Sequence, residues 1–256
     1  MRRPLVLGNW KMNGDMVSNE QLLGGLLDLS EPLLERARVD VGLAVPSPYL
    51  FQVAIRLRGR GVHWGAQDVS DQPSGAFTGE ISVHMLQDFE CTFSLVGHSE
   101  RRARQAESDD SVNRKTKALQ AKGLMPVVCV GESLEQRQSG RATDAVCAQV
   151  RAALVGLDAE KVVDVAIAYE PIWAIGSGLA ARPEDAQAMH LSIREALRAA
   201  GLPSDRLRIL YGGSVRAADA AVLLAQPDID GVLVGGASLD AVEFSGILQA
   251  AVARVH

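Results

Sequence analysis

Eight short apolar runs alternate with longer amphipathic stretches along the whole chain, and this alternation limits the possible folds more than any other feature. Several runs, such as PVVCV and GVLVG, are apolar at almost every position, as strands buried on both faces are. The predicted strands cover residues 5–10, 41–45, 62–67, 92–97, 125–130, 163–169, 207–211 and 231–235.

Helical patterns lie between these runs, and two of them end in a glycine stop. They cover residues 19–29, 110–123, 143–154, 182–201 and 216–227. Eight strand–helix units in 256 residues predict an α/β fold, a single (β/α)8 barrel domain spanning 1–256. A doubly wound open sheet is the alternative, but it usually has fewer strands, and the first turn here, GNWKMNG, lacks the GxGxxG pattern.

Charge and apolar content exclude several classes of protein. The net charge is -5 and no block of basic residues is present, so we expect no nucleic acid partner. No apolar run approaches the roughly 20 residues of a membrane-spanning helix, and the N-terminal apolar run is too short for a signal peptide. Cys91, Cys129 and Cys147 form no metal-type pair, and we interpret them as buried thiols of a cytoplasmic protein.

Residues that could take part in a reaction lie where the predicted strands end. In a (β/α)8 barrel the carboxyl ends of the strands converge on one site. Asn9 and Lys11 end the first strand, His98 ends the fourth and Glu170 ends the sixth. These four side chains and two glycine-rich turns are therefore predicted to face one pocket.

Glu170 is followed by a proline, four apolar residues and the glycines Gly176 and Gly178. Most glutamates are solvated loop acids. Here the apolar segment could act as a hinged lid that excludes water, since Pro171 stiffens one end and glycines free the other. Desolvation would raise the pKa of the acid and make it a better base for a carbon acid.

His98 precedes Ser99, which we expect to cap a helix beginning at Glu100. The helix dipole disfavours protonation there, so a neutral imidazole could donate a hydrogen bond to a substrate oxygen, although a structural histidine is also possible. His63, His84, His190 and His256 lack this context.

A lysine is usually a solvated charge at the surface. At this position Lys11 could stabilise an oxyanion, balance a phosphate or form a Schiff base. Asn9 adds an amide donor. The turns YGGSV and VGGAS are candidate phosphate cradles, because glycine lets backbone N–H groups approach an anion. Their position after the last two strands is the usual phosphate position in this architecture.

Eight ordered motifs show that the chain resembles the triosephosphate isomerase family along nearly its whole length. They are GNWKMN, GAQDVS, GAFTGE, VGHSERR, CVGE, AYEPIWAIGSG, YGGSV and VGGASL. The resemblance implies a TIM barrel that interconverts dihydroxyacetone phosphate and glyceraldehyde 3-phosphate in glycolysis and gluconeogenesis, without cofactor or metal.

The resemblance also implies roles for individual residues. Glu170 would be the base, His98 the neutral electrophile, and Lys11 the source of positive charge, with Glu100 as a site acid beside it. Asn9 would be a further polar contact. The phosphate-binding positions would be Gly176, Ser214, Gly235 and Gly236, and Tyr211 with Ser214 would latch the closed lid.

The family is usually a homodimer, in which the loop here at about 68–80 reaches into the neighbouring subunit. Thr78 matches the tip residue that supports the partner's Asn9 and Lys11. The sequence departs from the family at Asp68, where asparagine is common, and at DQPSG in the loop. Ser177 and Leu179 in the lid also differ from the common pattern, and we expect little effect on chemistry. An aldolase using Lys11, or a phosphate-binding protein without catalysis, are the rival interpretations.

Overall fold

Eight parallel strands close into a barrel in the computed structural model, which describes residues 2–34, 39–158, 160, 162–175 and 181–254. Neighbouring strands pair in sequence order and β1 also pairs with β8, so the sheet has no free edge. The strands are β1 Leu5–Asn9, β2 Asp40–Val45, β3 His63–Ala66, β4 Phe93–Val96, β5 Met125–Val130, β6 Ala166–Tyr169, β7 Arg208–Tyr211 and β8 Gly231–Val234.

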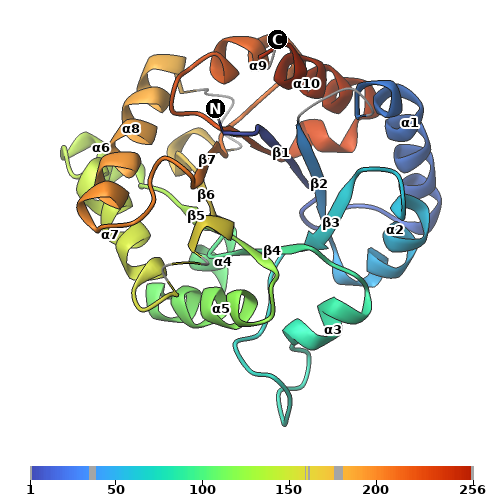
Figure 1. Cartoon of the computed structure of the whole chain (residues 1–256), viewed down its shortest axis with the longest axis horizontal. Helices are drawn as coiled ribbons and strands as arrows, with labels where there is room; N and C mark the ends of the chain where they lie inside the picture. Colours follow the sequence, from blue (N-terminus) through green and yellow to red (C-terminus); the bar gives the residue numbers. More distant parts are fainter. Residues whose placement is uncertain (1, 35–38, 159, 161, 176–180, 255–256) are drawn as a thin grey trace.

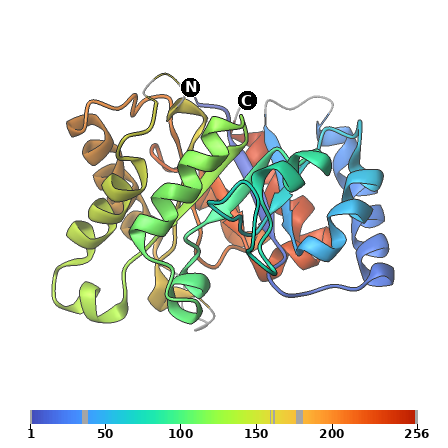
Figure 2. The same cartoon turned by 90° about the horizontal axis from the view of Figure 1, so that it is seen from below.

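Helices surround the barrel on all sides (Figures 1 and 2). They are α1 Met16–Leu34, α2 Leu50–Leu57, α3 Val83–Asp88, α4 Ser99–Arg104, α5 Asp109–Ala121, α6 Leu134–Gln138, α7 Ala142–Leu154, α8 Pro183–Ala199, α9 Ala217–Leu224 and α10 Ala241–Ala253. Short 3₁₀ turns lie at η1 Ser47–Tyr49, η2 Val162–Asp164, η3 Ile172–Ala174 and η4 Gly236–Leu239. The predicted (β/α)8 barrel is confirmed, with each predicted strand within a few residues of an observed one.

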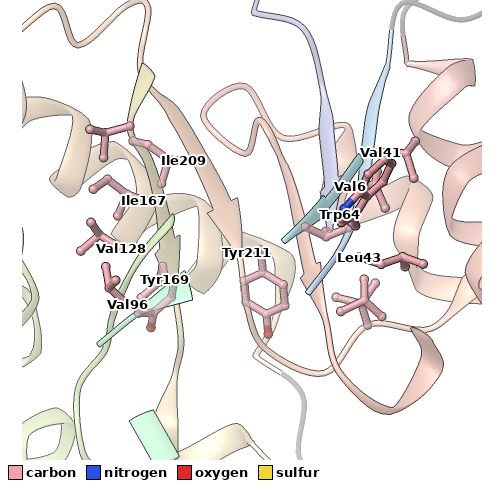
Figure 3. Close-up of a cluster of buried hydrophobic side chains, with 14 of the residues drawn as sticks. Val6, Val41, Leu43, Trp64, Val96, Val128, Ile167, Tyr169, Ile209 and Tyr211 are labelled. Carbon is pink, nitrogen blue, oxygen red and sulfur yellow. The ribbon is translucent and has the colours of Figure 1, made fainter. Parts of the chain in front are cut away.

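Side chains alternate between two hydrophobic layers along each strand, as the period of two requires. Ala166 and Ala168 of β6 belong to the cluster inside the barrel, whereas Ile167 and Tyr169 belong to the layer between strands and helices. Figure 3 shows part of this outer layer, with Ile167, Tyr169 and Ile209 in one group. Because both layers are apolar, the strands read as continuous hydrophobic runs.

Small residues make room for a large one inside the barrel. Phe93 of β4 is fully buried, and a Cβ atom added to Gly42 of β2 would lie 2.8 Å from its ring. A Cβ atom on Gly65 of β3 would lie 2.2 Å from the carbonyl oxygen of Phe93. Alternating small and large residues across facing positions thus fill the interior, and the barrel is a packed core rather than a channel.

His190 of α8 is a fully buried histidine. Its ring packs edge-on against Tyr169 at 5.8 Å, and Nδ1 lies 3.2 Å from the carbonyl oxygen of Asp228. Among the described residues, Nε2 has no hydrogen-bond partner. Burial lowers the pKa of His190 to about 3, since a charged ring would be desolvated and its second N–H would have no acceptor.

This burial makes the folded state sensitive to acid. The unfolded chain takes up a proton at His190 below its ordinary pKa of about 6.5, whereas the folded chain does not. The stabilising contribution is therefore complete above about pH 6.5 and is lost as the pH falls toward 3. The loss in the free energy of unfolding reaches roughly 2 kcal/mol at pH 5.

We expect His190→Asn, which keeps a donor for the Asp228 carbonyl, to be less stable than wild type at pH 7.5 but to lose less stability on acidification. Urea unfolding of both proteins at pH 7.5, 6 and 5 measures the free energy of unfolding. An equal loss of that free energy between pH 7.5 and pH 5 in the two proteins would contradict the prediction.

Candidate active site

The alternation that builds the core also places the candidate base. Ala166 and Ala168 point into the barrel, and Glu170 continues the same parity one step beyond the end of β6. Asn9 likewise follows Leu5 and Leu7 at the end of β1. Because parallel strands end at one rim, the two polar side chains meet above the apolar interior.

One cavity of about 680 Å³ brings most of the sequence-predicted site residues together. Its lining includes Asn9, Lys11, His98, Glu170, Ser214, Gly235 and Gly236. His98 reaches it because Gly97, with a φ of +72°, interrupts the alternation after β4. Glu100 lines an adjoining cavity of about 630 Å³ that shares Asn9, Lys11 and His98 with the first. Gly176 lies outside the described residues, as do Ser177, Gly178 and Leu179.

Glu170 is only 2 % exposed, and each of its carboxylate oxygens has a donor. Oε1 lies 2.8 Å from Nε2 of His98, and Oε2 accepts the backbone N–H of Ser99 at 2.8 Å. A buried carboxylate is stable only with such partners. The acid is therefore held in a defined position at the wall of the cavity, beside the imidazole.

His98 is itself the N-cap of α4, which corrects the expectation that Ser99 caps a helix starting at Glu100. The helix begins at Ser99, and Nδ1 of His98 accepts the backbone N–H of Glu100 at 3.2 Å. An Nδ1 atom that accepts a hydrogen bond carries no proton, so the neutral ring carries its proton on Nε2. That N–H points to Glu170, at the cavity.

The pKa of His98 differs from what its helix position alone predicts. Burial opposes charge on the imidazole, but the nearby carboxylate of Glu170, assisted by Glu100, outweighs it and raises the pKa. In this arrangement Glu170 contacts Nε2 directly, so its carboxylate acts against the effect of the helix N-terminus on the ring. The helix N–H at Nδ1 still opposes a second proton on the ring.

Lys11 has an unusual backbone, with a φ of +52°. Two side chains hold it there: Oδ1 of Asn9 accepts the Lys11 N–H at 3.0 Å, and Nε2 of Gln67 donates to the Lys11 carbonyl at 2.9 Å. Non-glycine residues in this region cost free energy and are common where a site must be pre-organised. The strained backbone points to a functional position for the lysine.

The Lys11 ammonium is paired with Glu100, Nζ to Oε1 at 2.6 Å. Burial alone would raise the pKa of Glu100, but the hydrogen bond and charge of Lys11 lower it overall. The two side chains form an ion pair, and Lys11 also lines the cavity that contains Glu170.

Backbone groups also line the cavity. A Cβ atom on Gly235 would lie 3.4 Å from Cε of Lys11, whereas one on Gly236 would meet open space. Ser214 is exposed in the same cavity. Glycine backbone and a hydroxyl offer hydrogen-bond donors to an anion without filling the space that it needs.

The loop 68–80 is anchored to two helices at its first residue. Asp68 accepts Nζ of Lys115 at 2.7 Å and Arg101 at 2.6 Å, and Lys115 also contacts Glu107 at 2.5 Å. Burial raises the pKa of Asp68, and the lysine charge only partly offsets it. The carboxylate that replaces the common asparagine thus belongs to a partly buried ion cluster, and Glu107 has its partners there.

Three residues make contacts that the sequence did not predict. Ser99 acts through its backbone N–H, which carries no sequence signal. Gln67 lies in the motif GAQDVS, and Glu132 ends CVGE. Oε1 of the fully buried Glu132 accepts Trp173 Nε1 at 2.7 Å and the Tyr169 hydroxyl at 3.1 Å. The two motifs marked both positions, but only the fold shows what they contact.

Within the described ranges, no group of three or more histidine, cysteine or acidic side chains is arranged to hold a metal ion. No helix in the described part of the chain combines the length and apolar character needed to cross a bilayer.

Comparison with known proteins agrees with the geometry. The family model described as triosephosphate isomerase matches residues 4–251. A triosephosphate isomerase of Bordetella pertussis is 49 % identical over 97 % of this chain and 98 % of its own length. Those of Paracidovorax citrulli and Herminiimonas arsenicoxydans are 48 % and 46 % identical, over 98 % of this chain and 99 % and 100 % of their own lengths. The chain therefore belongs to the triosephosphate isomerase family.

Proposed function

We propose that this chain interconverts dihydroxyacetone phosphate and glyceraldehyde 3-phosphate, with Glu170 as the base. The observation that carries the proposal is the pairing of a buried carboxylate with an imidazole at 2.8 Å on the wall of one cavity. Moving a proton between adjacent carbons needs a base, a donor to the carbonyl oxygen and charge stabilisation, and the cavity contains a residue for each.

The reaction begins when a substrate oxygen takes the place of Glu170 at Nε2 of His98. Glu170 removes a proton from the carbon next to the carbonyl, and the Nε2–H of His98 donates to the oxygen that becomes negative. Moving the carboxylate away from Nε2 also removes the charge that favours an imidazolium. His98 gives its Nε2 proton to the negative oxygen and takes a proton from the neighbouring hydroxyl oxygen, so that one proton moves between the two substrate oxygens. The protonated Glu170 carboxyl group then returns a proton to the neighbouring carbon, which completes the isomerisation.

Lys11 supplies positive charge to the enediolate, and Asn9 is a further polar contact. The phosphate group fits the cavity at Ser214, Gly235 and Gly236, with Gly176 as an additional contact. Trp173 and the apolar residues beside it begin the lid that would exclude water from the intermediate.

A Schiff-base aldolase is the rival that uses the same lysine. A Schiff base needs a neutral amine as nucleophile. Lys11 instead forms an ion pair with the carboxylate of Glu100 at 2.6 Å, so its Nζ is engaged there rather than free to attack a carbonyl carbon. Borohydride treatment with substrate is therefore expected to leave the enzyme unmodified.

We also propose that the protein works as a homodimer in the cytoplasm. The loop 68–80 extends away from the barrel (Figure 1), and Phe77 in it is 45 % exposed. Met12, beside Lys11, is 96 % exposed and lines the 630 Å³ cavity next to the active site. A partner's loop placed in that cavity would cover both apolar side chains and support Asn9 and Lys11.

Thr78→Arg tests the dimer. Thr78 is exposed at the tip of the loop, so the substitution leaves the barrel intact. A bulky cation at the tip is expected to yield monomers whose kcat is roughly tenfold lower, because Lys11 loses its support. Sedimentation velocity and a coupled isomerase assay measure both properties. Fully active monomers would contradict the proposed role of the loop.

A further inference from the structure

The peptide of Gly131 lies against the peptide of the candidate base. The last residues paired between β5 and β6 are Val130 and Tyr169, and the Glu170 N–H donates to the Val130 carbonyl at 2.7 Å. A Cβ atom on Gly131 would lie 1.9 Å from the carbonyl oxygen of Glu170. The two backbones therefore touch with no spare space, and a shift of Gly131 would shift Glu170.

Gln149 of α7 holds Gly131 by two hydrogen bonds. Its Oε1 accepts the Gly131 N–H at 2.8 Å, and its Nε2 donates to the Gly131 carbonyl at 3.1 Å. Strand β5 ends at Val130, so these bonds satisfy both backbone groups of Gly131 where the strand stops. The side-chain amide thus continues the backbone hydrogen bonding by one residue beyond the end of β5.

The next residue, Glu132, connects the same segment to the beginning of the lid. Its carboxylate receives hydrogen bonds from the Tyr169 hydroxyl and from Nε1 of Trp173, before and after Glu170 in the sequence. The segment 131–132 thus contacts the backbone of Glu170 and the side chains of Tyr169 and Trp173. Gln149 is the side chain that fixes its first peptide.

We propose that Gln149 is a positioning residue for the isomerase reaction, because it fixes the Gly131 peptide against which Glu170 is set. This inference rests on the proposed function. Within the described part of the chain, Gln149 is not among the residues that line the cavity. Its loss should therefore misplace the base and lower kcat, while leaving substrate binding nearly unchanged.

Gln149→Met and Gln149→Glu form the test. Methionine has a similar length but makes neither hydrogen bond, whereas glutamate keeps the acceptor for the Gly131 N–H and loses the donor. We expect kcat to fall about tenfold in Gln149→Met with KM within about twofold of wild type, and to fall less in Gln149→Glu. Hydrogen exchange should be faster at the Gly131 amide in Gln149→Met.

Asn113→Leu is the matched control. Asn113 of α5 also donates twice to backbone carbonyls, those of Ala153 and Val155 at 2.9 and 3.0 Å, but away from the cavity. Asn113→Leu should therefore lower the melting temperature of the protein and leave kcat unchanged.

If the wild type is active, either of two results would overturn this inference without affecting the proposed function. Gln149→Met could match the wild-type kcat, or Asn113→Leu could lose as much activity as Gln149→Met. If Gln149→Met does not fold, unchanged kcat in Gln149→Glu would also overturn it. An inactive wild type would instead overturn the proposed function, and this inference with it.

Discussion

Glu170→Gln is expected to lower kcat on the order of 10³-fold, the middle of the range for loss of a general base. The amide has the shape of the carboxylate but cannot accept a proton from carbon. Because the proposed phosphate-binding residues are untouched, KM should change little. A coupled assay with glyceraldehyde 3-phosphate measures both constants.

The fold of Glu170→Gln should be preserved at a small cost. Glu170 receives two hydrogen bonds, and the amide can accept only one of them, so one donor from His98 or Ser99 would face an N–H group. Circular dichroism checks the fold. Glu243→Gln is the matched control, since Glu243 lines the same cavity but accepts the Ala217 N–H of α9. It should retain most of the activity. A Glu170→Gln enzyme as fast as wild type would contradict the assignment of the base.

Lys11→Met is expected to lower kcat/KM by about 10²- to 10³-fold, as the removal of a charge that stabilises an anionic transition state does. Lys11 faces a substrate with a phosphate group and an enediolate, in a cavity that also contains the carboxylates of Glu170, Asp240 and Glu243. Without the ammonium, Glu100 also loses the partner that lowers its pKa. The same coupled assay gives the measurement.

The double variant Lys11→Met, Glu100→Gln separates two causes. It removes the unpaired carboxylate as well as the ammonium, and it should remain slow if Lys11 acts on the substrate directly. Recovery of wild-type kcat/KM in the double variant would mean that the loss came from the uncompensated charge of Glu100.

Strand positions could be predicted because burial on both faces leaves a strong pattern. All eight apolar runs are strands, and the inward parity of Ala166 and Ala168 extends directly to Glu170. Helices were harder: α2, α3, α6 and α10 were not identified, and α1 is longer than predicted. Three of the four have at most eight residues, too short for a clear period of 3.6.

The site was predictable in its residue types and not in its contacts. Sequence motifs gave Asn9, Lys11, His98 and Glu170, but the N-cap role of His98 depends on where α4 starts, a boundary that sequence places only approximately. The pKa of His98 depends on the distance to Glu170, 72 residues away in the chain. The hydrogen bonds between Gln149 and Gly131 likewise join residues that meet only when α7 packs beside the end of β5.

The most direct test of the account is the isomerisation of dihydroxyacetone phosphate by the wild-type enzyme in D₂O, followed by proton NMR. The account predicts rapid formation of glyceraldehyde 3-phosphate, with solvent deuterium on the carbon that receives the proton, because the proton passes through the Glu170 carboxyl group. Absence of turnover, or a product whose carbon-bound hydrogen all comes from the substrate, would contradict it.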